Sequence, residues 1–287
     1  MNASFEPGNC FYDSQGLRLH YVDWGNDSAP PLILLHGGRD HCRSWDMIAR
    51  SLRPHFHVIA PDLRGHGDSE WAKGSSYSLS DHVYDLTHLA PAGRETTIVA
   101  HSFGGMIALA YAGTYPDRVS RLAVLDGAFL PDAPSASIDA QMAKWVAQLD
   151  KISRSKARRY RTVAEAAERM SAHNSRLTSA QALHLASHAV RENADGTYSW
   201  KYDPYQRVRA PYRLSPENYV ALWSRITSPT LLLCGGESFI PDPKAARIMA
   251  CFKQAELKVI AGAGHWLHHD KPDDVLAALR LFLGVRG

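Results

Sequence analysis

The chain of 287 residues contains little cysteine, and its four cysteines are widely separated. Cys10, Cys42, Cys234 and Cys251 show neither the CxxC spacing of a zinc site nor the density of a disulfide-stabilised domain. We therefore expect free thiols and a reducing compartment.

Long apolar runs are also missing. No stretch approaches the roughly 20 apolar residues that a membrane-spanning helix requires. The first residues, Met1 to Pro7, do not combine a basic segment with an apolar one, so no signal peptide is predicted. Both absences predict a cytoplasmic protein without a membrane partner.

A strong excess of one charge sign is missing as well. The formal net charge is +3, which is well short of the basic balance of a dedicated nucleic-acid binder. Hydrophobic residues make up 45% and charged residues 21% of the chain, as in ordinary globular proteins. We expect a compact protein with no nucleic-acid partner, whereas the composition says nothing about the oligomeric state.

The strand-like segments begin with a predicted antiparallel pair. Cys10 to Asp13 and Leu17 to Trp24 alternate in polarity and flank Ser14-Gln15-Gly16, which is typical of a hairpin turn. Pro31 to Leu35 is apolar throughout, as expected for a strand buried on both faces of a parallel sheet. Further strand-like runs follow at His57 to Ala60, Thr96 to Ala100, Arg121 to Leu125, Thr230 to Cys234 and Leu257 to Ile260.

Helical patterns lie between most of these runs. Alternating strands and helices predict an α/β fold with a mostly parallel, doubly wound sheet. The functional loops of such a sheet lie at the carboxyl ends of its strands. The predicted helices are Trp45 to Leu52, Leu79 to Leu89, Met106 to Tyr115, Pro243 to Cys251 and Pro272 to Leu283.

The alternation is interrupted between Gly127 and Ser228. This segment shows helical periodicity and no clear buried strand, so we interpret residues 127–228 as an inserted helical cap. Residues 1–126 and 229–287 then form the α/β core. The helices expected in the cap are Ala140 to Leu149, Val163 to Ser171 and Ala180 to Val190.

The segment Ala100-His101-Ser102-Phe103-Gly104-Gly105 stands where a predicted buried strand ends and an apolar helix begins. A serine on such a sharp turn needs small neighbours two residues to either side, because the backbone there is strained and tightly packed. Ala100 and Gly104 meet this requirement. Ser102 is therefore the candidate nucleophile.

This segment resembles the nucleophile elbow, G-x-S-x-G, of the α/β-hydrolase superfamily, with alanine in place of the first glycine. The same resemblance is carried by His36-Gly37-Gly38, by Pro61-Asp-Leu-Arg-Gly-His-Gly-Asp-Ser69 and by Gly262-Ala-Gly-His265. It implies an α/β-hydrolase fold with a helical cap, and a serine hydrolase that needs no cofactor.

His265 is the expected general base. A serine hydroxyl is a poor nucleophile at neutral pH unless a base removes its proton as it attacks. His265 follows the last predicted strand in a glycine-rich loop, which is where the family has its histidine.

The carboxylate that orients this histidine has two candidates. Glu237, in Gly235-Gly-Glu-Ser-Phe-Ile-Pro241, resembles the family's usual acid loop, although the glycine spacing is one residue short. Asp126 ends the strand from which some family branches take their acid. The loop pattern slightly favours Glu237, which predicts that Glu237→Gln lowers kcat far more than Asp126→Asn.

The resemblance assigns the oxyanion hole to the backbone N–H groups of Gly38 and Phe103. Arg39 lies next to Gly38 but is interpreted as an exposed side chain and is not assigned to the catalytic set.

No metal site is predicted. Asp62, His66 and Asp68 belong to a segment that the resemblance identifies as a structural turn, and they lack ligand spacing on a helix pair. The adjacent His268 and His269 also lack metal-site spacing and are assigned to a loop or a helix start.

The expected reaction is hydrolysis of a small or medium apolar carboxylic ester through an acyl-enzyme. A helical cap would enclose the pocket and leave little room for a polymer. Lactone opening and carbon–carbon bond hydrolysis of diketones use the same triad and stay open. A slow-turnover receptor for a small molecule is the alternative outside catalysis, whereas epoxide and haloalkane hydrolysis are disfavoured because the family uses an aspartate nucleophile for them.

Overall fold

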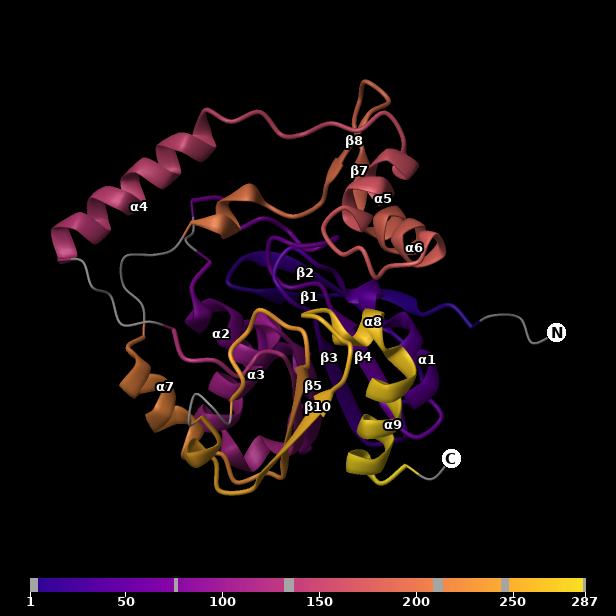
Figure 1. Ribbon diagram of the computed structural model, residues 1–287, viewed down its shortest axis with the longest axis vertical. Helices are drawn as coiled ribbons and strands as arrows, with labels where there is room; N and C mark the ends of the chain where they lie inside the picture. Colours follow the sequence, from indigo (N-terminus) through magenta and orange to yellow (C-terminus); the bar gives the residue numbers. More distant parts are fainter. Residues whose placement is uncertain (1–4, 75–76, 132–136, 209–213, 244–247, 286–287) are drawn as a thin grey trace.

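One eight-stranded sheet runs through the computed structural model, which describes residues 5–74, 77–131, 137–208, 214–243 and 248–285 (Figure 1). The strand order is β1-β2-β4-β3-β5-β6-β9-β10. The pairs β1–β2 and β2–β4 are antiparallel and the other pairs are parallel, so the predicted doubly wound sheet is confirmed. The strands are β1 (Gly8–Ser14), β2 (Leu17–Asp23), β3 (Pro31–Leu35), β4 (His57–Pro61), β5 (Thr96–His101), β6 (Val119–Leu125), β9 (Thr230–Gly235) and β10 (Ala255–Ile260).

The first hairpin closes through a turn with two residues in the left-handed region. Gln15 has a φ of 48° and Gly16 a φ of 73°, the conformation that a tight two-residue hairpin turn requires. The predicted turn is therefore present at the predicted residues.

The central strands are buried on both faces because helices cover the sheet on both sides. All five residues of β3 are buried. Leu32 and Leu34 join one hydrophobic cluster with α1 (Asp46–Leu52) and α9 (Pro272–Leu283). Ile33 and Leu35 join a second cluster, which includes α2 (Leu79–Leu89), α3 (Phe103–Thr114) and α7 (Pro216–Trp223). Successive side chains of a strand point to opposite faces, so one apolar run supplies both layers.

Between β6 and β9 the chain leaves the sheet and forms most of the predicted insertion. Helices α4 (Ile138–Ser153), α5 (Val163–Ser171) and α6 (Ser179–Ala189) match the predicted periodic segments. The latter two helices pack around a small cluster of their own that includes Tyr160, Ala166 and Ala186. In Figure 1, α5 and α6 lie beyond one edge of the sheet, and α4 lies at the periphery.

The segment between β6 and β9 differs from the prediction of a separate helical cap in two respects. It contains two short strands, and its last helix, α7, packs with the core. Strands β7 (Val190–Glu192) and β8 (Tyr198–Trp200) form a separate two-stranded antiparallel sheet. Each has only three residues, too few for an alternating pattern to be recognised in sequence. Helix α7 packs with the core cluster through Tyr219 and Trp223. The exact division at residues 127 and 228 stays a prediction.

Two of the helices predicted in the core include 3-10 turns. The predicted helix Trp45 to Leu52 is a 3-10 turn η1 (Cys42–Trp45) followed by α1. Of the predicted helix Pro243 to Cys251, residues 244–247 lie outside the described residues, and the remainder includes a 3-10 turn, η4 (Ile248–Cys251).

None of the helices in the described residues is long and apolar enough to cross a bilayer. All four cysteines are free thiols, as expected.

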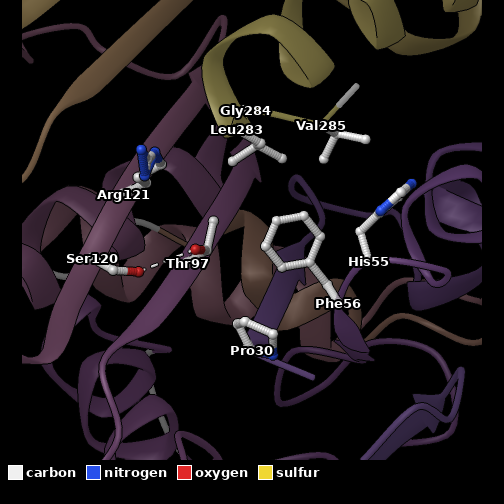
Figure 2. A pocket seen from close by; sticks show the side chains of 9 residues that line it. All are labelled: Pro30, His55, Phe56, Thr97, Ser120, Arg121, Leu283, Gly284 and Val285. Carbon is white, nitrogen blue, oxygen red and sulfur yellow. Dashed lines mark hydrogen bonds between the residues drawn. The ribbon is translucent and has the colours of Figure 1, made fainter. Parts of the chain in front are cut away.

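A cavity of about 560 Å³ lies at the amino ends of the strands (Figure 2). Pro30 precedes β3, Thr97 lies near the start of β5, and Ser120 near the start of β6. Its other lining residues are His55, Phe56, Arg121, Leu283, Gly284 and Val285. The segments with predicted functional residues follow the opposite, carboxyl ends of β3, β5, β6, β9 and β10.

The contact between α3 and α7 depends on Gly113. A Cβ atom at this position would lie 2.3 Å from the backbone oxygen of Leu222. Replacing glycine by alanine inside a helix normally stabilises a protein by about 0.5–1 kcal/mol, but this clash with backbone reverses the sign. We predict that Gly113→Ala lowers the free energy of unfolding in urea by about 1–3 kcal/mol.

Gly8→Ala is the matched control, because its Cβ atom would have no neighbour closer than 4.0 Å. Equal or higher stability of Gly113→Ala relative to this control would contradict the packing described.

Buried neutral histidines make stability depend on pH. Burial lowers the pKa of His82 on α2 to about 3 from its ordinary value of 6.5. Between these values the unfolded chain binds a proton that the folded chain does not, so stability falls as the pH falls. This single group contributes a slope of about 1.4 kcal/mol per pH unit in that window.

We predict that the loss of unfolding free energy between pH 7 and pH 5 is smaller by about 2 kcal/mol in His82→Phe than in the wild type. His88→Gln, at an exposed position of the same helix, should leave the loss unchanged. Urea titrations at the two pH values measure both. An unaltered pH dependence in His82→Phe would contradict a buried neutral imidazole at this position.

Candidate active site

Ser102 occupies a sharp bend between β5 and α3. Its φ of 52° and ψ of −118° lie outside the regions that L-residues ordinarily adopt. Two backbone hydrogen bonds hold the bend, one from Ser102 N–H to the oxygen of Leu125 (2.9 Å) and one from Met106 N–H to the oxygen of Ser102 (3.2 Å). The predicted strand-to-helix turn is therefore present, with its serine at the turn.

The bend requires residues without larger side chains around it. A Cβ atom on Gly104 would lie 2.5 Å from the backbone oxygen of His36. A Cβ atom on Gly127 would lie 2.5 Å from the oxygen of Ser102 itself. The small residues in the motif thus follow from the close approach of β3, β5 and β6.

The Ser102 hydroxyl faces the imidazole of His265. Their Oγ and Nε2 atoms are 2.9 Å apart, so Ser102 donates a hydrogen bond to an unprotonated Nε2. His265 itself lies in the loop after β10, and its side chain is 7% exposed. The structure brings together two predicted residues that are 163 positions apart in the sequence.

The carboxylate bonded to His265 is that of Asp126, and the preference for Glu237 is corrected on this point. His265 Nδ1–H donates to Asp126 Oδ2 at 2.7 Å. The side chain of Asp126 is 1% exposed, whereas that of Glu237 is 58% exposed. Glu237 is instead paired with Arg176 of the insertion, at 2.5 Å.

The loop after β9 contributes to this arrangement in a way that the sequence did not reveal. Ser238 Oγ–H donates a hydrogen bond to Asp126 Oδ2, and Gly235 N–H approaches the other carboxylate oxygen at 3.4 Å. Asp126 has a positive φ of 50°, which turns its side chain away from the direction of β6. The loop after β9, which resembles the family's acid loop, therefore holds the carboxylate of Asp126 at the end of β6.

The two predicted oxyanion donors lie close to each other beside Ser102. Phe103 is the first residue of α3, and the first N–H groups of a helix have no acceptor within it. Gly38 follows β3, and a Cβ atom on it would lie 4.0 Å from that of Phe103. A Cβ atom on Gly37 would lie 3.1 Å from Ser102 Cβ, so this loop passes directly beside the serine.

Two buried histidines fix the loop after β3. His36 Nδ1–H donates to the oxygen of Gly37 at 2.7 Å, and its Nε2 accepts from Leu63 N–H at 3.0 Å. His66 Nε2 accepts from Arg39 N–H at 2.9 Å. Arg39 thus contributes its backbone to the loop, and the residue is exposed as expected.

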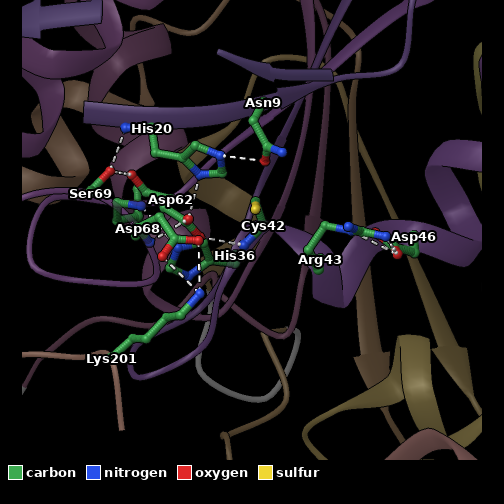
Figure 3. A network of polar contacts seen from close by, with 11 residues as sticks. Asn9, His20, His36, Cys42, Arg43, Asp46, Asp62, Asp68, Ser69 and Lys201 are labelled. Atoms are coloured by element: carbon green, nitrogen blue, oxygen red, sulfur yellow. Dashed lines mark hydrogen bonds and ion pairs between the residues drawn. The ribbon is translucent and has the colours of Figure 1, made fainter. Parts of the chain in front are cut away.

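The Asp62 carboxylate organises the turn after β4 (Figure 3). It accepts hydrogen bonds from His20 Nδ1 (2.7 Å), from Cys42 N–H (2.7 Å) and from Asp68 N–H (2.9 Å). Burial raises the pKa of Asp62, but these donors and the nearby histidine outweigh it and hold the pKa well below its ordinary value. The side chains of His66 and Asp68 contact other partners. His66 Nε2 accepts from Arg39 N–H (2.9 Å), and the Asp68 carboxylate forms an ion pair with Lys201 (2.8 Å). The arrangement is that of a structural turn.

His101 packs behind the His265 loop. Its Nε2–H donates to the backbone oxygen of His265 at 2.9 Å, and the two ring centroids are 4.8 Å apart. Burial holds the pKa of His101 well below its ordinary value, so this ring is neutral at physiological pH. Neither this bond nor the one from Ser238 was anticipated, although both residues adjoin motif residues in the sequence.

Comparison with known proteins shows the family to which the chain belongs. The family model described as alpha/beta hydrolase fold matches residues 30–272. The sn-1-specific diacylglycerol lipase ABHD11 of Mus musculus is 28% identical over 284 residues, which cover 90% of this chain and 82% of the relative. Esterase YbfF of Escherichia coli (strain K12) is 28% identical over 262 residues, which cover 88% and 92%.

A solved structure is similar over nearly its whole length. The thioesterase domain from the curacin biosynthetic pathway superposes with a TM-score of 0.84 at 25% identity, covering 96% of this chain and 99% of the other. The matched family model spans most of the chain, from before β3 to the start of α9. The chain is therefore a member of the α/β-hydrolase fold family and an enzyme of that family.

Proposed function

We propose that the protein is a serine hydrolase that cleaves small or medium apolar carboxylic esters through an acyl-enzyme intermediate. The observation that carries this proposal is the continuous series of hydrogen bonds from Ser102 through His265 to Asp126. This series has the order of groups that activates a serine hydroxyl.

In the first step, His265 Nε2 takes the proton from Ser102 as Oγ attacks the ester carbonyl carbon. The imidazolium that forms is stabilised by Asp126, which also holds the tautomer with the proton on Nδ1. The carbonyl π-bond opens, and its electron pair moves to the oxygen. The resulting oxyanion accepts hydrogen bonds from the N–H groups of Gly38 and Phe103, each worth about 3 kcal/mol to the transition state.

The tetrahedral intermediate then collapses to an acyl-enzyme. The bond to the alkoxy oxygen breaks, and His265 gives its proton to the departing alcohol. Water attacks the acyl group through the same base, releases the acid and restores the Ser102 hydroxyl. All the groups in this cycle belong to the protein, the substrate or water.

The substrate class is inferred from what adjoins the serine. The ring of Phe239 is 72% exposed, and its centroid lies 4.6 Å from that of His265, so an apolar surface is available beside the site. Residues 127–228, which we propose as the cap, contact the catalytic edge through Arg176–Glu237 and through Asn174–Asp270 (2.8 Å). A cap attached there favours a small substrate over a polymer.

Two other reactions and one role outside catalysis stay open within the proposal. Lactone opening and carbon–carbon bond cleavage of diketones use the same three side chains. A receptor with slow turnover would also retain them. Epoxide and haloalkane hydrolysis are disfavoured, because residue 102 is serine.

We predict that Ser102→Ala abolishes hydrolysis of p-nitrophenyl butyrate and leaves the melting temperature within a few degrees of the wild type. Removing the hydroxyl eliminates the attacking atom but no packing group. Initial rates and thermal unfolding measure the two effects. Tight binding of small esters or lactones by the wild type without turnover would instead favour the receptor.

A second prediction separates the two carboxylates. Asp126→Asn should reduce kcat by about 10⁴-fold, because the amide favours the wrong tautomer of His265. Glu237→Gln, the matched control, should change kcat by less than about tenfold, since its charge is exposed. A larger loss from Glu237→Gln would return the acid role to the loop after β9.

A further inference from the structure

A second cluster of chemically reactive side chains lies next to the proposed catalytic residues. Asp40 follows the Gly38 loop by two residues, and His268 and His269 belong to the short helix α8 (Leu267–Asp270) after His265. One side-chain ligand atom from each of the three residues lies within 4.8 Å of those of the other two. No sequence pattern indicates this group, because Asp40 is more than 200 residues from the histidines.

The group is distinguished by polar atoms that have no partner. Asp40 Oδ2 is buried without a hydrogen bond in the described residues, and so are both ring nitrogens of His268. The hydroxyl of Ser44, four residues after Asp40, is also buried without a hydrogen bond in the described residues. A buried polar atom without a partner is costly, so a ligand there would remove a cost that the fold otherwise bears.

Three other groups in the described residues bring histidine and acidic side chains equally close, but each already contains an internal ion pair. In each of them a histidine nitrogen is paired with a carboxylate oxygen. These pairs are His20–Asp62 (2.7 Å), His57–Asp23 (3.0 Å) and His184–Asp46 (3.2 Å). Asp40, His268 and His269 form no such pair with one another. Their ligand atoms therefore stay available for a cation.

We propose that Asp40, His268 and His269 form a binding site for a divalent transition-metal ion, with Zn²⁺ as the best fit. Two imidazoles and one carboxylate are a common ligand set for Zn²⁺, with water as the fourth ligand. Mg²⁺ and Ca²⁺ prefer oxygen ligands and fit this set poorly. Ligand atoms around tetrahedral Zn²⁺ are about 3.4 Å apart, so the three side chains need only a small inward rotation.

The surroundings of the ligands resemble the support that metal sites require. Asp40 Oδ1 accepts a hydrogen bond from His41 N–H at 2.9 Å, which leaves Oδ2 for the ion. The ring of His268 stacks on Trp45 with centroids 4.8 Å apart and planes 21° apart. Contacts of this kind fix the direction of a ligand before the metal binds. Asp40 is only partly buried, which gives an ion a route from solvent.

A bound ion would connect two loops that the proposed reaction uses. One loop carries Gly38 and the other carries His265, and an ion shared by both would hold them together. Because the site exists only in the folded chain, the ion would also raise the melting temperature. Neither consequence requires that Ser102 be a nucleophile, so this site can be tested whether or not the proposed hydrolysis is correct.

Isothermal titration calorimetry with ZnCl₂ on the metal-free full chain tests the site. We expect one tight site per chain, no comparable site for MgCl₂, and a rise of the melting temperature with Zn²⁺. Asp40→Asn and His269→Gln should each weaken Zn²⁺ binding at least about tenfold. His184→Gln, in the neighbouring histidine group, is the matched control and should retain the wild-type affinity.

Visible absorption of the Co²⁺-loaded protein adds a readout of coordination geometry, and circular dichroism of the metal-free variants shows whether each is folded. If one of the two variants fails to fold, the other still tests the site. Loss of the tight site in His184→Gln, with retention in Asp40→Asn and His269→Gln, would assign the ion elsewhere and overturn the proposal. Several weak sites that no single substitution removes would mean an adventitious ion only, and would overturn it as well.

Discussion

The strained backbone at Ser102 is the constraint on which the functional edge of this protein depends. A non-glycine residue held in an unfavourable conformation costs about 1–3 kcal/mol, and the surrounding structure must enforce it. Here hydrogen bonds to the carboxyl end of β6 and from the first turn of α3 hold the bend. The bend leaves room only for glycine at positions 104 and 127, which allows β3 and β6 to approach the serine. The Gly38 loop and Asp126 reach the serine because of this approach.

Residues after the neighbouring strands β6 and β9 together position the contact between Asp126 and His265. Asp126 ends β6, but the hydroxyl of Ser238 from the loop after β9 donates to its carboxylate. A Cβ atom at Gly235 would lie 2.2 Å from the backbone oxygen of Gly264, so this loop also packs directly on the loop of His265. Ser238 and the glycines therefore couple the positions of Asp126 and His265. Arg176, from the segment between β6 and β9, pairs with Glu237 at this edge.

Much of the fold was predictable because its signals are local. Continuous apolar runs such as Pro31 to Leu35 and the small residues around Ser102 report burial and strain directly. The carboxylate that contacts His265 was not predictable, since Asp126 and Glu237 both follow strands at the same edge and only the direction of each side chain separates them. Strands β7 and β8 are too short to leave a pattern. The cluster of Asp40 with His268 and His269 depends on how distant loops meet, which no spacing in the sequence encodes.

The most direct test of the account is covalent trapping with a fluorophosphonate ester, followed by intact mass measurement and peptide mapping. The hydrogen bonds of Ser102 and His265 imply one adduct per chain, located on the peptide that contains Ser102, with much slower labelling after His265→Gln. Rapid ester hydrolysis by an enzyme that carries no adduct at Ser102, or that carries it at another residue, would contradict the account.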